Sequence, residues 1–247
     1  MANVLKTVWS NPWYLMIIFL SALVIISSFF FNSMRILGLS LVSVITAVFT
    51  DAIIRRIKVR AWNYPVGAVI SGLIVAIALS FTTSVYIVVL TAFTAMLLKN
   101  LIRVKGNHIF NPANLGLLVV GLILNPGLAW WAVINPWIMM IFLIPIYKVK
   151  RFPVLLSFIV LFSLLQLLES KSDFDLLYTA FLGILFWVMV MIVEPLTSPQ
   201  KTKSQAIFGC LTAIFAFLFM QILPVYFMLA ALAAADLFVP LLKKYLG

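Results

Sequence analysis

Residues 13–31, WYLMIIFLSALVIISSFFF, decide the class of fold. The run contains no charged residue, and its length matches the roughly 20 apolar residues that an α-helix needs to cross a bilayer. It is too long for the core of a signal peptide, and no small-residue cleavage site follows a short core, so we expect no cleavable leader here. The run therefore predicts a transmembrane helix.

The rest of the 247-residue chain is also strongly apolar. Hydrophobic residues make up 65% of the chain and charged residues only 9%, and the mean hydropathy is +1.22. A soluble domain is usually about a quarter charged. The composition excludes a soluble enzyme, a disordered chain and a nucleic-acid-binding protein. We predict an all-α, polytopic membrane protein that forms a single transmembrane domain over residues 1–247.

Charged and Pro/Asn-rich breaks divide the chain into ten candidate spans. They cover residues 13–31, 36–54, 64–81, 84–98, 109–124, 132–147, 153–168, 176–193, 206–223 and 225–241. The third and fourth spans are separated only by residues 82–84, and the ninth and tenth meet near Pro224.

Basic residues mark one side of the membrane. Fifteen of the 17 Lys and Arg residues fall on one side, and only Arg35 and Lys171 fall on the other. The basic side holds both termini and the loops at residues 55–60, 99–105, 148–151 and 194–205. Because short loops rich in Lys and Arg stay in the cytoplasm, we expect a cytoplasmic (inner) membrane protein with both termini cytoplasmic. The net charge of +11 is then mainly a topology signal.

Two similar tetrads lie about half a chain apart, Ser10-Asn11-Pro12-Trp13 and Ile134-Asn135-Pro136-Trp137. Each opens a half of five spans, residues 10–125 and 132–245. Since five is odd, the second half would be inverted, an arrangement that often holds a ligand near the repeat interface. The alternative is coincidence, because Asn-Pro is a common helix start and Trp is common at membrane interfaces.

Three irregular segments fall on the cytoplasmic side. Irregular backbone in a membrane is tolerated only inside protein or beside a cavity. The first segment, residues 63–72, begins the third span and contains Gly67, Ser71 and Gly72. These small residues either let a flat ligand approach the backbone or serve helix packing alone.

The second segment, residues 106–116, is the most informative. Asn111 suits a helix N-cap and Pro112 suits the first helical position. We expect the helix to begin after a short re-entrant stretch, with free N–H groups facing a cavity. The other polar side chains of the segment are Asn107, His108 and Asn114. A lone histidine is more often a structural partner than a metal or haem ligand.

The third segment, residues 194–199, combines helix-breaking prolines with Glu194, Thr197 and Ser198. Glu194 is either a binding residue or a solvated acid at the end of a helix. Two more acids lie at helix depth, where a carboxylate is a functional candidate. Of these, we expect Asp51 to pair with Arg55 one turn on, which leaves Asp236 as the candidate.

At these residues the chain resembles the RnfD/NqrB family, the membrane subunits of the Rnf and Na⁺-NQR electron-transport complexes. The family pattern Gly-x-Asn-x-Phe-Asn-Pro-Ala resembles residues 106–113, although the Asn lies one place early. The patterns Ser-Ala-x-Val-Thr-Gly-Leu and acid-Pro-Val-Thr-Ser-Pro resemble residues 67–73 and 194–199. The family's Ile-Phe-Gly motif resembles residues 207–209. Its final helix has an inward polar residue before Val-Pro, which resembles residues 235–240 with Asp236 as the polar residue. The resemblance covers roughly residues 60–245 and implies ten helices.

The resemblance also implies a cofactor. Family members carry FMN covalently on a Ser/Thr-Gly-Ala-Thr tetrad in a long extracytoplasmic segment between the fifth and sixth helices. Here that segment shrinks to residues 125–131 and the tetrad is missing, so we expect no covalent FMN. The family's non-covalent flavin site is associated with the cytoplasmic side, and the motifs of that side are retained. We therefore expect riboflavin or FMN, bound non-covalently.

Thirteen residues are candidates for this flavin site, and no catalytic residue or metal ligand is expected. They are Gly67, Ser71, Gly72, Asn107, His108, Phe110, Asn111, Pro112, Asn114, Glu194, Thr197, Ser198 and Asp236. The asparagines would contact the pyrimidine edge of the ring. The helix start at Pro112 would stabilise negative charge on the reduced ring.

The implied function is that of an oxidoreductase subunit in a translocase-type complex. It would pass electrons from a cytoplasmic flavoprotein or ferredoxin-type donor to a membrane acceptor such as quinone, among lipid and other subunits. A basic cytoplasmic face would attract an acidic donor. Two alternatives stay open from the sequence: an inverted-repeat transporter or channel for a small solute or ion, with Asp236 as a coupling carboxylate, and a structural anchor with a vestigial site.

Overall fold

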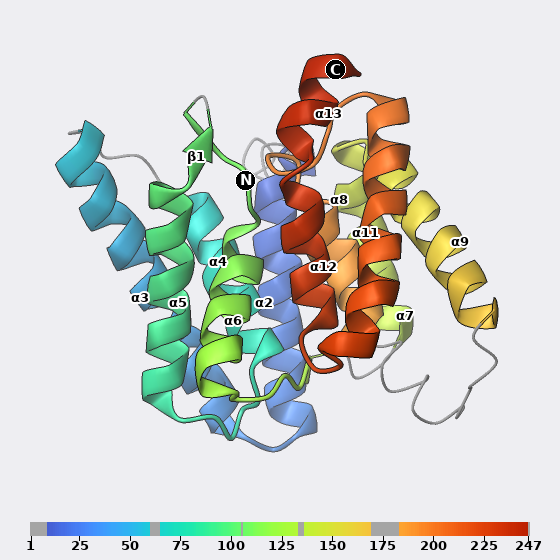
Figure 1. Ribbon diagram of the computed structural model, residues 1–247. Helices are drawn as coiled ribbons and strands as arrows, with labels where there is room; N and C mark the ends of the chain where they lie inside the picture. The colour runs from blue at the N-terminus through green and yellow to red at the C-terminus, as the bar shows by residue number, and fades with distance from the viewer. Residues whose placement is uncertain (1–8, 60–64, 105, 133–135, 169–182, 247) are drawn as a thin grey trace.

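The computed structural model describes residues 9–59, 65–104, 106–132, 136–168 and 183–246 (Figure 1). Its elements are α2 (Pro12–Phe30), α3 (Met34–Val59), α4 (Val66–Ala78), α5 (Val85–Leu101), β1 (Arg103–Val104), β2 (Asn107–His108), α6 (Pro112–Leu124), α7 (Pro136–Met139), the 3-10 turn η1 (Met140–Phe142), α8 (Leu143–Lys148), α9 (Phe152–Leu168), the π-helix η2 (Trp187–Ile192), α11 (Thr202–Ile222), α12 (Phe227–Asp236) and α13 (Val239–Tyr245).

The described helices follow the predicted spans in order and confirm an all-α, polytopic membrane protein. Three of them are long and apolar enough to cross a membrane: Pro12–Phe30, Met34–Lys58 and Thr202–Ile222. Shorter apolar helices pack among them. The tight turn before α5 and the break between α11 and α12 lie where the sequence places them. The sixth span is divided into α7, η1 and α8, and the tenth into α12 and α13.

The connections alternate between the two ends of the bundle. The hairpin β1–β2 and α13 lie at the upper end in Figure 1, and the loop from α2 to α3 lies at the lower end. Arg35 is at the lower end, where its guanidinium donates to the carbonyl of Thr83 at 3.1 Å. The alternation places the described basic loops at the upper end, as the basic-residue pattern predicts.

Small residues set the spacing of neighbouring helices. A Cβ added at Gly72 of α4 would lie 2.7 Å from the Cα of Val44 on α3. The Ser43 hydroxyl donates to the carbonyl of Gly72 at 2.7 Å. Gly72 was a candidate for the flavin site, but the structure gives it a role in packing α4 against α3.

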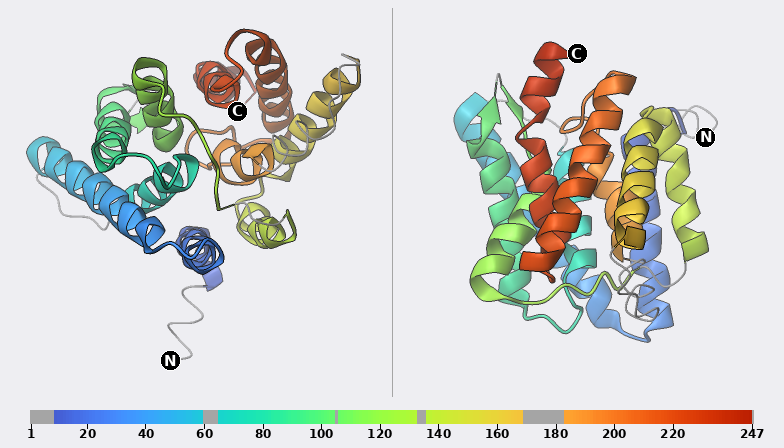
Figure 2. Two further views of the ribbon diagram at one scale, coloured as in Figure 1. Left: turned by 90° about the horizontal axis from the view of Figure 1, so that it is seen from below. Right: turned by 45° about the vertical axis from the view of Figure 1, so that its right-hand side comes forward.

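The segment η2 lies in the interior. The left-hand view of Figure 2 looks along the helices and places residues 183–192 between α4 on one side and α9 and α11 on the other. All six residues of η2 are buried. A π-helix is rare and often marks a functional site, because its wider turn displaces backbone carbonyls from the regular ladder.

The shortened segment after α6 covers the lower end of α4. Asn125 ends α6 in the left-handed conformation, with φ of 46°. The Ala129 N–H then donates to the carbonyl of Ala78 at 2.9 Å, and the Trp131 indole donates to Ala76 at 2.9 Å. These bonds satisfy carbonyls at the end of α4 that have no partner within the helix.

Candidate functional site

Two adjoining cavities lie near the upper ends of the helices. The first, the inner cavity, lies between α2, α4, α8 and η2 and has about 570 Å³ of space, part of it open to the outside. It is lined by Pro12, Trp13, Met16, Gly67, Ile70, Ser71, Ile74, Asn111, Pro145, Ile146, Val149, Val190, Val193, Glu194 and Pro195. Most of these side chains are apolar, as in small-molecule sites generally.

The second, the outer cavity, has about 1010 Å³ of space and is far more polar. It is lined by Asn11, Trp13, Arg55, Val66, Gly67, Ser71, Lys99, Arg103, Gly106, Asn107, His108, Pro112, Glu194 and Leu196. Trp13, Gly67, Ser71 and Glu194 line both cavities. Together the two cavities form an apolar chamber, which is the inner cavity, with a polar mouth, which is the outer cavity.

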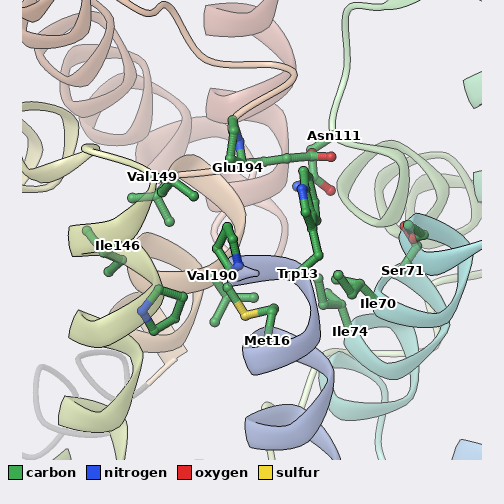
Figure 3. Close-up of a pocket in the computed structure, with 15 residues that line it drawn as sticks. Trp13, Met16, Ile70, Ser71, Ile74, Asn111, Ile146, Val149, Val190 and Glu194 are labelled. Carbon is green, nitrogen blue, oxygen red and sulfur yellow. Dashed lines mark hydrogen bonds between the residues drawn. The ribbon is translucent and has the colours of Figure 1, made fainter. Parts of the chain in front are cut away.

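Trp13 occupies the middle of the inner lining. In Figure 3 it lies between Ile70 and Ile74 of α4 on one side and Val190 and Ile146 on the other. The side chain of Asn11 caps α2 by accepting a bond from the Trp13 N–H at 3.0 Å, which places the indole in the first helical turn. The Ser10-Asn11-Pro12-Trp13 tetrad, which the sequence marks only as a possible repeat, thus places Trp13 in the linings of both cavities.

A buried ion cluster borders the outer cavity. Asp51 is fully buried; its Oδ2 lies 2.8 Å from the Nε of Arg55, and its Oδ1 lies 3.2 Å from the Nζ of Lys99. The Asn100 amide also donates to Oδ1, at 3.1 Å. The predicted pair of Asp51 and Arg55 is confirmed. Lys99 was assigned to a loop, but it lies in the last turn of α5 with its side chain only 5% exposed.

The start of α6 ties three segments together. Asn111 is the N-cap, as predicted, and its Oδ1 accepts a bond from the Asn114 N–H at 3.0 Å. The Asn111 N–H donates to Oδ2 of Asp236 at 3.1 Å, and its amide donates to the Met191 carbonyl at 3.2 Å. The expectation that free N–H groups face a cavity is therefore wrong for Asn111 and Asn114, because side-chain oxygens accept from both.

Asn114 and Asp236 are fully buried and lie outside the linings of both cavities. The Asn114 amide donates to the carbonyl of Leu229 at 2.8 Å and accepts from the Trp187 indole at 3.4 Å. These bonds join α6 to α12 and η2. The second carboxylate oxygen of Asp236, Oδ1, has no hydrogen-bond partner among the described residues.

Glu194 lies where the third segment meets the hairpin. One carboxylate oxygen is 3.6 Å from Nε2 of His108, and the other accepts from the Thr197 hydroxyl at 3.3 Å. The Ser198 hydroxyl donates to the Glu194 carbonyl at 2.7 Å and accepts from the Arg151 guanidinium at 2.8 Å. Thr197 and Ser198 therefore hold Glu194 and its turn in place.

Two cations outside the spans secure the same turn. Arg151 also donates to the carbonyl of Pro195 at 3.2 Å, and Lys243 donates to Leu196 at 3.1 Å. Burial lowers the pKa of the Arg151 guanidinium. Burial, and then the positive charge of Arg151, lower the pKa of the Lys243 ammonium group.

The structure brings about half of the sequence candidates to the cavities. Gly67, Ser71, Asn107, His108, Asn111, Pro112 and Glu194 line one or both. Gly72, Phe110, Asn114, Thr197, Ser198 and Asp236 lie outside both linings. Residues 63–64 of the first segment lie outside the described residues. Within the described ranges, no group of three or more His, Cys, Asp and Glu side chains could hold a metal ion.

Comparison with known families gives one match. The family described as the NQR2, RnfD, RnfE family matches residues 9–134, just over half of the chain. The match includes the segments that form α2, α4 and α6, whereas Glu194 and Asp236 lie beyond it. No curated protein matches the chain at a significant level.

Proposed function

The chain belongs to the NQR2, RnfD, RnfE family, and on this premise we propose that it is a membrane redox subunit that binds a flavin non-covalently. The flavin would be riboflavin or FMN, held in the inner and outer cavities near the cytoplasmic face. Electrons would pass from a cytoplasmic flavoprotein or ferredoxin-type donor to a membrane acceptor such as quinone. Other subunits of an electron-transport complex would bring the electron donor and the acceptor to this subunit.

The proposal of a flavin site rests on the apolar inner cavity and the polar outer cavity that forms its mouth. A flavin has a flat tricyclic ring and a polar tail, and the two cavities offer matching surroundings on either side of Gly67 and Ser71. Trp13 provides an aromatic face in the chamber, and aromatic rings favour offset or edge contacts with other rings. Ile70, Ile74 and Val190 complete an apolar slot.

The side chains at the mouth would orient the ring and tune its potential. A bound flavin supplies the capacity to accept electrons in pairs and release them singly. Glu194, which lines both cavities, would accept a ring N–H, and its negative charge would influence the potential of the ring. Asn111 would help to shape the site, because its side-chain amide donates to Met191 and so holds the start of α6 against η2.

One structural feature favours the alternative of a small-solute or ion channel. The π-helix η2 and the divided helices α7–α8 and α12–α13 are interruptions of the kind found beside substrate sites in transporters. Both functions would use the same cavities, so the cofactor content of the protein decides between them.

The test is the absorbance spectrum of the purified protein before and after acid precipitation, with the released compound identified. We expect a flavin spectrum and complete release by acid. Gly67→Leu should lose most of the flavin, because a Cβ at Gly67 has only Lys99 Nζ nearby, at 3.7 Å, and the larger side chain would extend into the cavities.

Gly38→Leu is the matched control, because a Cβ there meets nothing within 4 Å, and this variant should keep its flavin. Colourless wild-type protein, alone and in its complex, would contradict the proposal. Solute uptake by vesicles containing such colourless protein would establish the channel instead.

A further inference from the structure

Three cations border the outer cavity on the side of α3 and α5. Arg55 and Lys99 come from the ion cluster, and Arg103 follows α5. The Nε of Arg103 donates to the carbonyl of Lys99 at 3.4 Å, which holds its guanidinium beside the end of that helix. All three residues line the outer cavity.

The nearby carboxylates do not neutralise these three cations. Asp51 serves both Arg55 and Lys99, so that pair of cations shares one negative charge. Among the described acids, Glu194 lines the outer cavity and Asp51 does not, and Glu194 lies against His108. Lys99 is buried, whereas Arg55 is partly exposed and Arg103 is exposed, so the cations present positive charge at the open side of the cavity, where it attracts an anion.

Lys99 is open to the cavity because its neighbour on α4 has no side chain. The closest atom to a Cβ built on Gly67 is Lys99 Nζ, at 3.7 Å. Any larger residue would stand between the ammonium group and the space shared by the two cavities. The side chain of Lys99 is thus only 5% exposed, yet it still lines the outer cavity.

We infer that Arg55, Lys99 and Arg103 bind a phosphate monoester, so that the flavin held here is a phosphorylated one such as FMN and not riboflavin. This inference rests on the proposed function for the position of the ring. Guanidinium and ammonium groups form strong charge-assisted hydrogen bonds with phosphate oxygens. With the ring in the inner cavity, the tail reaches the mouth where these cations lie.

The test compares FMN with riboflavin on flavin-free protein in phosphatidylcholine nanodiscs, using the quenching of flavin fluorescence. We expect wild-type protein to bind FMN at least tenfold more tightly than riboflavin. The double variant Lys99→Met/Arg103→Gln should bind FMN at least tenfold more weakly and riboflavin as before. Asp51 keeps Arg55 and the Asn100 amide as partners in this variant, so its charge stays compensated.

Arg56→Gln is the control, because it removes a cation of α3 that does not line the outer cavity; its preference for FMN should equal that of wild type. Inorganic phosphate should compete with FMN and leave riboflavin binding unchanged. Equal affinity of wild-type protein for both flavins would overturn the inference and leave the proposed function standing. Binding of phosphatidic acid that saturating FMN does not displace would overturn it in favour of a lipid phosphate.

Failure of both flavins to bind would contradict the proposed function itself. In that case calorimetry with inorganic phosphate still decides the phosphate site. Binding of inorganic phosphate to wild-type protein but not to the double variant would establish the phosphate site without the flavin. Absence of phosphate binding would overturn the phosphate site as well as the proposed function.

Discussion

At the scale of single residues, Asp51 shows how a charge is accommodated within an apolar bundle. It contacts Arg55 one turn along α3, Lys99 from α5 and the amide of Asn100. A lone buried carboxylate would be strongly disfavoured, and removal of one partner of a buried pair leaves the other charge uncompensated. The cluster therefore joins α3 to α5 and also sets the charge of the mouth.

We expect Asp51→Leu to lower the free energy of unfolding by about 3–5 kcal/mol, because Lys99 stays buried without its carboxylate. Asp51→Leu/Lys99→Met should recover much of the loss, since Arg55 is 31% exposed and can reach water. The measurement is thermal or denaturant unfolding in detergent. If the double variant is no more stable than the single one, the buried charge is not the cause.

At the scale of elements, α4 has two different faces built from small residues. Gly72 faces α3 at a distance that leaves no room for a side chain, whereas Gly67 and Ser71 face the cavities. The small-residue motif thus serves helix packing and binding at once. The two roles lie on different faces of the helix, because Ser71 and Gly72 are adjacent in the sequence.

We expect Gly72→Ala to destabilise the protein by about 1–3 kcal/mol, because its Cβ would lie 2.7 Å from the backbone of Val44 and force the helices apart. Gly38→Ala provides the matched control, since nothing lies within 4 Å of its Cβ. It should be neutral or slightly stabilising, as alanine favours a helix. Equal unfolding midpoints for the two variants would show that α3 and α4 tolerate a wider spacing.

At the scale of the whole molecule, the described basic loops gather at one end (Figure 1). Residues of these loops and of the nearby helix ends line both cavities. Positive charge retains loops in the cytoplasm during insertion. The cavity mouth would then open toward a soluble electron donor. The same charge would raise the rate at which an acidic donor associates.

Single cysteines in a Cys210→Ala background test this orientation with a membrane-impermeant maleimide. We expect Thr82→Cys, at the exposed lower end, to react in intact cells. Lys203→Cys, exposed at the upper end, should react only after the membrane is opened. The reverse labelling pattern would place the cavities on the outer side.

The sequence by itself determined those features that depend on local chemistry. The length of apolar runs predicts the spans, and the alternation of basic loops predicts which ends lie together. The cap formed by Asn111 and Pro112 and the pair of Asp51 and Arg55 were also predictable, because each involves residues within one helical turn. About half of the site candidates predicted from the sequence motifs line the cavities.

Only the tertiary structure decided which side chains face the cavities. It brought Trp13 and Lys99 into the linings, and it turned Asn114 and Asp236 toward neighbouring helices. The physical reason is that helices apolar on every side carry no stripe that marks the buried face. Their rotation is set by packing at small residues such as Gly72 and by a few buried hydrogen bonds between distant segments.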